Sequence, residues 1–229
     1  MTDLMRTNRD GVAWLALNRP ESRNALSTDL LLCLQDELVS VREDSDTLVV
    51  VLSGTGSAFC SGGDIKEFGP TPTSEQGLIR FGLIEAVLAQ LRDLPQPTIA
   101  AVNGAAIGAG WGLSMACDVC FSSAEAKYSI PELAKGLRLP AAIVHRLTQI
   151  VGPVRAAAIV LEGGTFDARQ AMEWGWATAS FADRKELTEQ AWRIATELAS
   201  RTPQSLAAIK QSLRLPLPRQ ASEYPLRED

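Results

Sequence analysis

The apolar residues near the start of the chain change their spacing twice. Residues 4–7 and 12–17 alternate as strands do, and the polar turn between them predicts a hairpin. Residues 28–42 repeat apolar positions at helical spacing, directly after Ser27, whose hydroxyl suits a helix N-cap. Residues 48–52 are apolar without interruption, as in a strand buried on both faces. The order predicted is strand, strand, helix, strand.

The same alternation continues along the middle of the chain. We expect a helix over 78–94, a strand over 98–102, a helix over 108–117 and a strand over 119–122. Strands alternating with helices predict an α/β unit whose parallel strands are joined by right-handed crossovers. After Pro131 the pattern becomes mostly helical. Helices are expected at 141–150, 154–161, 168–174, 185–200 and 203–214, and the polar, proline-bearing tail from 215 is expected to fray.

Composition narrows the class of protein. Hydrophobic residues make up 46% and charged residues 21% of the 229 positions, which is ordinary for one soluble domain or two small ones. The net charge of −5 argues against nucleic acid or an anionic membrane as the main partner, because both attract clustered cations. There is no apolar signal core and no run long enough to span a membrane, so we expect a cytoplasmic protein.

Two glycine-rich segments, 54–64 and 103–112, each follow a buried strand. Neither has the spacing of a phosphate loop or of a dinucleotide-binding turn. Their simplest interpretation is tight turns and close backbone packing. Cys117 and Cys120 stand without a second pair or a nearby histidine, so we expect no metal site and a reduced, buried pair.

Several short motifs occur in a fixed order. They are Asn18-Arg-Pro-x-x-x-Asn-Ala-Leu26, Phe59-Cys-Ser-Gly-Gly-Asp-Ile65, Asn103-Gly-x-x-x-Gly-x-Gly110, Pro131-Glu132, Val151-Gly-Pro153 and Ala168-x-x-Ala-x-x-x-Gly175. Together they resemble the crotonase superfamily (the enoyl-CoA hydratase/isomerase family) across roughly residues 10 to 214. Each motif alone is unspecific, whereas the ordered set is not.

The resemblance implies an α/β fold of the ClpP/crotonase type, a spiral of repeated ββα units followed by a helical C-terminal region. It implies an acyl-CoA-binding core over residues 1–200 and a short helical segment with a tail over 201–229, truncated relative to the family. The ligand would be an acyl-CoA thioester, with no cofactor other than the coenzyme A of the substrate. A homotrimer or a dimer of trimers is the assembly that the family suggests.

The family shares one chemical step, in which two backbone N–H groups stabilise negative charge on the thioester oxygen. By resemblance these groups belong to Ser61 and Ala109. The physics suits Ala109, because amides in the first turn of a helix lack intrahelical partners and lie at the positive end of the helix dipole. Each donor of this kind typically contributes about 2.7–4 kcal/mol of transition-state stabilisation.

The acidic residues suggest which reaction follows. Family hydratases carry two glutamates; Glu132 matches one of them, and Gly112 stands where the other would be. Adding water is best served by two groups, whereas moving a double bond needs one base. We therefore expect Glu132 to act in 3-enoyl-CoA to 2-enoyl-CoA isomerisation. Hydration, thioester hydrolysis, decarboxylation and a catalytically weakened acyl-CoA-binding protein are the alternatives, and Pro140 in the place of a family acid weakens the hydrolase interpretation. Alone, Pro131-Glu132 would be only a solvated helix start.

Binding residues follow from the same resemblance. Those expected around the coenzyme A are Arg23, Ala25, Leu26, Gly63, Asp64 and Ile65. Arg23 could pair with a phosphate, and Asp64 could either hold its loop or touch the ligand. The acyl group would lie toward 66–85. Its walls would come from Phe68, Leu78, Phe81 and Ile84. Cys60 and Trp111 are expected to be packing residues, and His145 a surface residue or one that acts behind Glu132.

Overall fold

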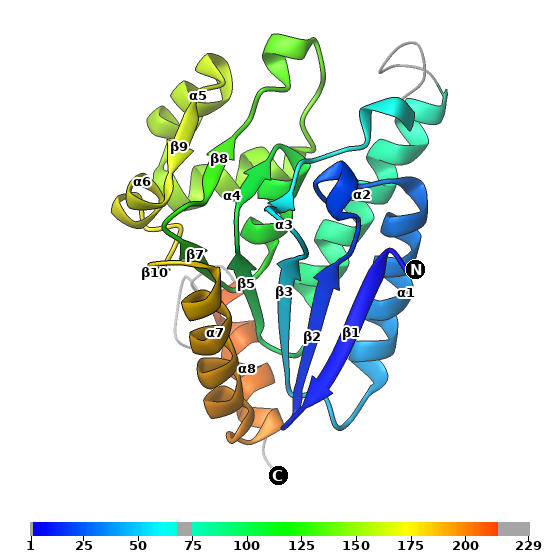
Figure 1. Ribbon diagram of the computed structural model, residues 1–229, viewed down its shortest axis with the longest axis vertical. Coiled ribbons are helices and arrows are strands. Elements are labelled where there is room, and N and C mark those ends of the chain that lie inside the picture. Colours follow the sequence, from blue (N-terminus) through cyan, green and yellow to red (C-terminus); the bar gives the residue numbers. More distant parts are fainter. Residues whose placement is uncertain (1, 68–74, 215–229) are drawn as a thin grey trace, which may run out of the picture.

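A sheet of six strands organises most of the chain (Figure 1). The computed structural model describes residues 2–67 and 75–214. In sheet order the strands are β1 (Leu4–Arg9), β2 (Val12–Leu17), β3 (Val49–Gly54), β5 (Thr98–Val102), β7 (Val119–Ser123) and β10 (Ala179–Phe181). β1 and β2 form the expected hairpin, and the other neighbouring pairs are parallel. The α/β pattern predicted from hydrophobic spacing is confirmed.

Helices lie against both faces of this sheet, and others lie beyond it (Figure 1). They are α1 (Thr28–Glu43), α2 (Glu75–Asp93), α3 (Ala109–Ala116), α4 (Ala141–Val151), α5 (Pro153–Glu162), α6 (Ala168–Glu173), α7 (Arg184–Ala199) and α8 (Pro203–Arg214). In β2, Leu15 and Leu17 face a core shared with α1 and α2, while Val12 and Trp14 face a second core shared with α7. Both faces are buried, which is why residues 48–52 form one unbroken apolar run.

A second sheet was not expected from residue patterns. It contains β4 (Ala58–Cys60), β6 (Ala105–Ile107), β8 (Lys127–Ser129) and β9 (Thr165–Asp167), in that order. β4 and β6 lie inside the two glycine-rich segments that we interpreted as turns. Three residues are too few to show a period of two, so pairing with distant neighbours decides these strands. The prediction of turns alone is corrected accordingly.

Local signals place the helix starts well. The Ser27 side chain accepts a hydrogen bond from the Leu30 N–H, as expected of an N-cap. At α6, Asp167 and Gln170 form a capping box. Lys210 of α8 is buried and donates to the Gln96 carbonyl and to Asp118, which attaches this helix to the rest of the chain.

The expected division of the chain into a core over residues 1–200 and a C-terminal segment over 201–229 stays a prediction. The fraying expected from residue 215 concerns residues outside the described part. No helix within the described residues is both long and apolar enough to span a membrane.

A buried asparagine holds the loop that follows β3. Asn24 is fully buried, and its Nδ2 lies 2.9 Å from the Thr55 and Ala58 carbonyl oxygens and 3.2 Å from that of Phe59. Its Oδ1 accepts a 2.9 Å hydrogen bond from the Arg19 N–H. Its φ of 56° is left-handed, a conformation that asparagine tolerates better than most residues. One side chain thus satisfies the main chain of two separate loops.

We expect Asn24→Ala to lower the free energy of unfolding by about 2–3 kcal/mol, because buried carbonyl groups lose their donor and alanine is strained at this φ. Urea unfolding of the variant checks this. Asn8→Ala, at an exposed position on β1, is the control and should change stability by less than about 0.5 kcal/mol. Equal midpoints for the two variants would contradict the role assigned to Asn24.

Candidate active site

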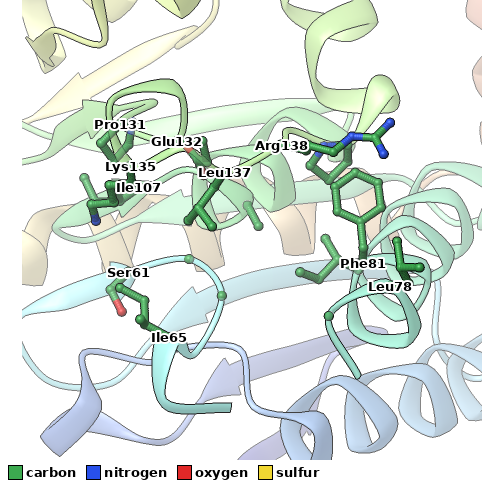
Figure 2. Close-up of a pocket in the computed structure, with 16 residues that line it drawn as sticks. Ser61, Ile65, Leu78, Phe81, Ile107, Pro131, Glu132, Lys135, Leu137 and Arg138 are labelled. Atoms are coloured by element: carbon green, nitrogen blue, oxygen red, sulfur yellow. The ribbon is translucent and has the colours of Figure 1, made fainter. Parts of the chain in front are cut away.

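The pocket lies where the chain leaves β4 and β6, at the carboxyl ends of these two parallel strands, which is the usual place for ligands in α/β sheets. Four parts of the chain line it (Figure 2): residues 61–65, the first half of α2, residues 107–109 and residues 131–140. The walls are mostly apolar, with a few polar and charged groups among them. This is the composition expected of a small-molecule site.

Glycines allow the two loops to approach each other by their backbones. A Cβ on Gly62, whose φ is 91°, would lie 2.8 Å from the Ile107 carbonyl oxygen and 3.7 Å from the Ala109 nitrogen. A Cβ on Gly110 would overlap the Cys60 carbonyl group. Side chains at these positions would push the loops apart. The glycine-rich segments therefore bring one loop against the start of α3.

Among the described residues the Ala109 amide lies unpaired at the pocket, and its oxyanion role stays a prediction. Ala109 is the first residue of α3, is buried and lines the pocket. Within the described residues its N–H donates no hydrogen bond, as is usual in the first helical turn. The positive end of the α3 dipole adds to the local potential. An unpaired amide at this point can donate a hydrogen bond to a negatively charged ligand oxygen.

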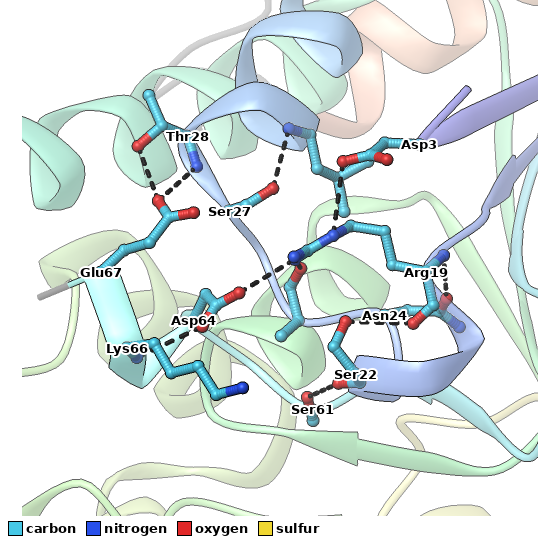
Figure 3. Close-up of polar contacts among 12 residues, drawn as sticks. Asp3, Arg19, Ser22, Asn24, Ser27, Thr28, Ser61, Asp64, Lys66 and Glu67 are labelled. Carbon is cyan, nitrogen blue, oxygen red and sulfur yellow. Dashed lines mark hydrogen bonds and ion pairs between the residues drawn. The ribbon is translucent and has the colours of Figure 1, made fainter. Parts of the chain in front are cut away.

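The Ser61 amide does not agree with its expected role. Its N–H donates a 3.0 Å hydrogen bond to the Arg23 carbonyl oxygen, and its hydroxyl donates to the Ser22 carbonyl oxygen at 3.1 Å (Figure 3). Both groups attach the loop to the turn before Ala25. Because an amide already bonded in the fold cannot also receive a ligand oxygen at full strength, the prediction for Ser61 is corrected.

The neighbouring amide that the described part of the chain leaves without an acceptor is that of Gly63. Leu26 pairs with Gly63 as an isolated parallel bridge, in which the Leu26 N–H donates to the Gly62 carbonyl and the Asp64 N–H donates to the Leu26 carbonyl. Successive amides of an extended chain point in opposite directions, so the Gly63 N–H points away from Leu26. Gly63 lines the pocket, and its N–H has no acceptor within the described residues. We had expected Gly63 only as a coenzyme A contact.

Glu132 places its carboxyl group in the same pocket. It lies just before a short 3₁₀ turn, Leu133–Lys135, and its carboxylate rests directly on Gly108, where any Cβ would overlap Oε1. Its Oε2 is buried and accepts no hydrogen bond within the described residues. Burial raises the pKa of the Glu132 carboxyl above its ordinary value, and a contact with its own backbone and the charge of Lys135 offset part of the rise. Among the described residues that line the pocket, it is the one acid.

The position of the second family glutamate faces elsewhere. Gly112 lines a different cavity, between α2, α3, α4 and α8. A Cβ at Gly112 would lie 2.5 Å from Cδ1 of Ile143, which is buried in the main core. The isoleucine thus occupies the space that a side chain at 112 would need.

Asp64 holds its loop. Its Oδ2 accepts a hydrogen bond from Arg19 at 3.1 Å, and its Oδ1 accepts one from the Lys66 N–H at 3.3 Å (Figure 3). Of the two roles considered for this residue, the structure favours the structural one. Ile65 is 64% exposed and lines the pocket, so it can contact a ligand.

The other expected coenzyme A contacts differ in what they expose. The Arg23 side chain is exposed, beside the turn that receives the Ser61 amide. Ala25 and Leu26 are buried, and Leu26 belongs to the main core, so they offer a ligand backbone rather than side chain. These roles stay predictions.

Three of the four residues expected to border the acyl group lie in the pocket. Leu78, Phe81 and Ile84 of α2 line the pocket, as predicted, whereas Phe68 lies outside the described residues. His145 is exposed and lines the other cavity, so it does not stand behind Glu132.

Cysteines and tryptophan behave as packing residues. Burial raises the pKa of the Cys60 thiol to about 12, which leaves it a poor nucleophile. Trp111 is fully buried, with its ring centroid 3.9 Å from that of Trp176. Within residues 2–67 and 75–214, no three His, Cys, Asp or Glu side chains gather as metal ligands would.

Comparisons with known proteins agree with this geometry. The family model described as enoyl-CoA hydratase/isomerase matches residues 7–226. The chain is 34% identical to 2,3-dehydroadipyl-CoA hydratase of Escherichia coli K12 over 216 residues, 93% of this chain and 82% of that protein. It is 30% identical to the peroxisomal Delta(3,5)-Delta(2,4)-dienoyl-CoA isomerase of Arabidopsis thaliana over 223 residues, 92% of this chain and 80% of that protein.

A solved structure supports the fold. The enoyl-CoA hydratase of Bacillus anthracis superposes with a TM-score of 0.88 at 32% identity, covering 92% of this chain and 82% of that one. The crotonase-type α/β fold with a helical C-terminal region is therefore confirmed. The relatives carry the names of both hydratases and isomerases, so the reaction must be argued from the site.

We expect Glu132→Gln to stabilise the protein at pH 7 by roughly 0.5–2 kcal/mol, the range common for replacing a strained functional group. A raised folded-state pKa means that folding disfavours the ionised carboxylate, so wild-type stability falls as pH rises through that pKa. The advantage of glutamine should disappear near pH 4, where the wild-type carboxyl is protonated. Urea unfolding at both pH values measures this.

Glu173→Gln, at an exposed position in α6, is the matched control and should show no such pH-dependent gain. A Glu132→Gln protein no more stable than wild type at pH 7 would contradict the buried, unpaired carboxylate.

Proposed function

The chain belongs to the enoyl-CoA hydratase/isomerase family of enzymes, and we propose that within it the protein moves the double bond of a 3-enoyl-CoA to the 2,3 position. One observation carries the choice of isomerisation: Glu132 is the single acid among the described residues lining the pocket, and Ile143 fills the space beside Gly112. One base can remove a proton from one carbon and return it to another. Adding water favours two groups.

In the proposed reaction, Glu132 removes a proton from C2 of the thioester. The C–H electrons pass into a dienolate, and the negative charge moves to the thioester oxygen. The same carboxyl then returns the proton to C4, and the double bond is left between C2 and C3. No water, electron or group is consumed. The unpaired Oε2 is available to receive the proton, and its desolvation makes it a stronger base.

The thioester oxygen is proposed to lie between the amides of Gly63 and Ala109. Both are unpaired within the described residues and line the same pocket as Glu132. Fixed donors stabilise the charge as it develops, because they need no reorientation during the reaction. Neither donor depends on a side chain.

The thioester ligand also sets the proposed contacts outside the reacting atoms. Arg23, exposed beside the pocket loop, would pair with a phosphate of coenzyme A, while Ala25, Leu26 and Ile65 line its path. The reaction needs no cofactor beyond the coenzyme A of the substrate. A trimer or dimer of trimers is the proposed assembly, and it would cover apolar surface such as Val154, which is 84% exposed.

We expect Glu132→Gln to reduce isomerisation of 3-hexenoyl-CoA by about 10²–10⁴-fold, the usual contribution of a positioned acid–base group. Binding of the saturated hexanoyl-CoA should stay within about twofold, because glutamine keeps the shape of the pocket. Absorbance of the conjugated product measures the first, and calorimetry the second. In wild type, kcat/KM should rise with pH as Glu132 ionises, with a midpoint above the ordinary glutamate pKa. Full activity of the variant would refute Glu132 as the base.

The reaction preference has its own test. Gly112→Glu alone should destabilise the protein, because its Cβ would lie 2.5 Å from Ile143. The pair Gly112→Glu with Ile143→Gly should fold better than Gly112→Glu alone, and it should still not hydrate 2-hexenoyl-CoA, because position 112 lines the other cavity. Ile143→Gly alone, which opens the space without an acid, is the control. Hydration by the folded double variant would show that an acid at 112 reaches the pocket, and it would contradict the placement of Gly112 beside the other cavity.

A further inference from the structure

The pocket has two ends with different chemistry. Ser61 and Ile65 lie at one end, near the proposed thioester site, and Phe81 and Leu78 lie at the other (Figure 2). Glu132 and Leu137 are seen between the two ends. An acyl chain that starts at the Gly63 and Ala109 amides and passes Glu132 would therefore end near Phe81.

Arg138 stands at this far end. It lines the pocket, and its guanidinium carbon lies 5.9 Å from the centre of the Phe81 ring. The side chain is exposed and takes part in no ion pair within the described residues. Glu85, one helical turn beyond Phe81 on α2, is bonded to the Ala141 N–H at 3.3 Å. The end of an apolar pocket thus carries a cation that the described fold leaves without an acid.

From this arrangement we propose that the acyl group ends in a carboxylate, which Arg138 binds at the far end of the pocket. A planar guanidinium can bind a carboxylate through two parallel hydrogen bonds. The Phe81 ring lies beside the guanidinium group of Arg138 and contributes a cation–π contact. The apolar wall of Leu78 and Ile84 would then enclose the methylene groups between the two ends. The substrate class is the coenzyme A ester of an unsaturated dicarboxylic acid. The inference rests on the proposed function in one respect, that the ligand is an acyl-CoA.

Lys135 is the other cation of the pocket, and it has a different place. Burial raises the pKa of Glu132, and the charge of Lys135 offsets part of that rise. Lys135 lies over Ile107, on the side of the pocket where Ser61 is found (Figure 2). A terminal carboxylate bound there would approach the Glu132 carboxylate, and like charges repel. The geometry therefore favours Arg138 as the residue that recognises the end of the acyl chain.

The test compares adipoyl-CoA with hexanoyl-CoA, which have six acyl carbons each and differ in the terminal group. Neither has a double bond to move, so binding is measured by calorimetry without turnover. Wild type should bind adipoyl-CoA about tenfold more tightly, the value of one partly exposed charge-assisted pair. Arg138→Met should reduce this ratio to about one or below, and Arg138→Lys should leave an intermediate ratio. Added salt should also reduce it.

Arg155→Met is the matched control, because Arg155 also stands over an aromatic ring, 5.3 Å from that of Trp174, and does not line this pocket. It should leave the ratio unchanged. If Arg138→Met weakens free coenzyme A and both thioesters equally, Arg138 contacts the coenzyme and the proposal is overturned. A wild-type ratio of one overturns it as well, and so does loss of the ratio in Lys135→Met but not in Arg138→Met.

Failure of the isomerase proposal remains distinguishable. An intact binding ratio without turnover of either 3-hexenedioyl-CoA or 3-hexenoyl-CoA would refute the reaction and support the carboxylate site. Turnover of 3-hexenoyl-CoA together with equal affinities for adipoyl-CoA and hexanoyl-CoA would support the reaction and refute the carboxylate site.

Discussion

Direct backbone contact between two loops is the constraint on which the site depends. The loop after β4 can reach the start of α3 because Gly62 and Gly110 place no Cβ between the chains. This contact brings the Gly63 and Ala109 amides, unpaired within the described residues, to one pocket. The buried Asn24 side chain donates hydrogen bonds to the Ala58 and Phe59 carbonyls of β4 and so holds the start of this loop in position. Stability and the proposed chemistry therefore share the same few contacts.

Within the part of the chain that the structure describes, Glu132 combines burial with an unpaired carboxylate oxygen. Its Oε2 is buried and has no hydrogen-bond partner in the described fold. Burying a polar atom in this way costs free energy of folding. The glycine at 108 lets the carboxylate lie against the backbone, and the charge of Lys135 limits the rise of its pKa. We expect a carboxylate held in this way to accept a proton more readily than an exposed one, and to reduce stability at neutral pH.

Core packing limits which side chain position 112 can hold. Ile143 belongs to the main core, yet its Cδ1 fills the space that a side chain at Gly112 would use. The packing that buries this methyl group therefore leaves no room for a side chain at 112. At the other end of the pocket, the exposed Arg138 side chain stands over the half-buried Phe81 ring.

The main strands and helices could be predicted from residue order, because periods of two and 3.6 are local signals that burial on one or both faces imposes. The ordered motifs likewise pointed to the family and to Glu132. Which amide is unpaired depends instead on the folded chain. Ser61, Gly62 and Gly63 look equivalent in the sequence, but the Ser61 N–H is bonded to the distant Arg23 carbonyl and that of Gly63 is not. The short strands of the second sheet and the position of Ile143 were beyond prediction for the same reason, since both depend on partners far away in the sequence.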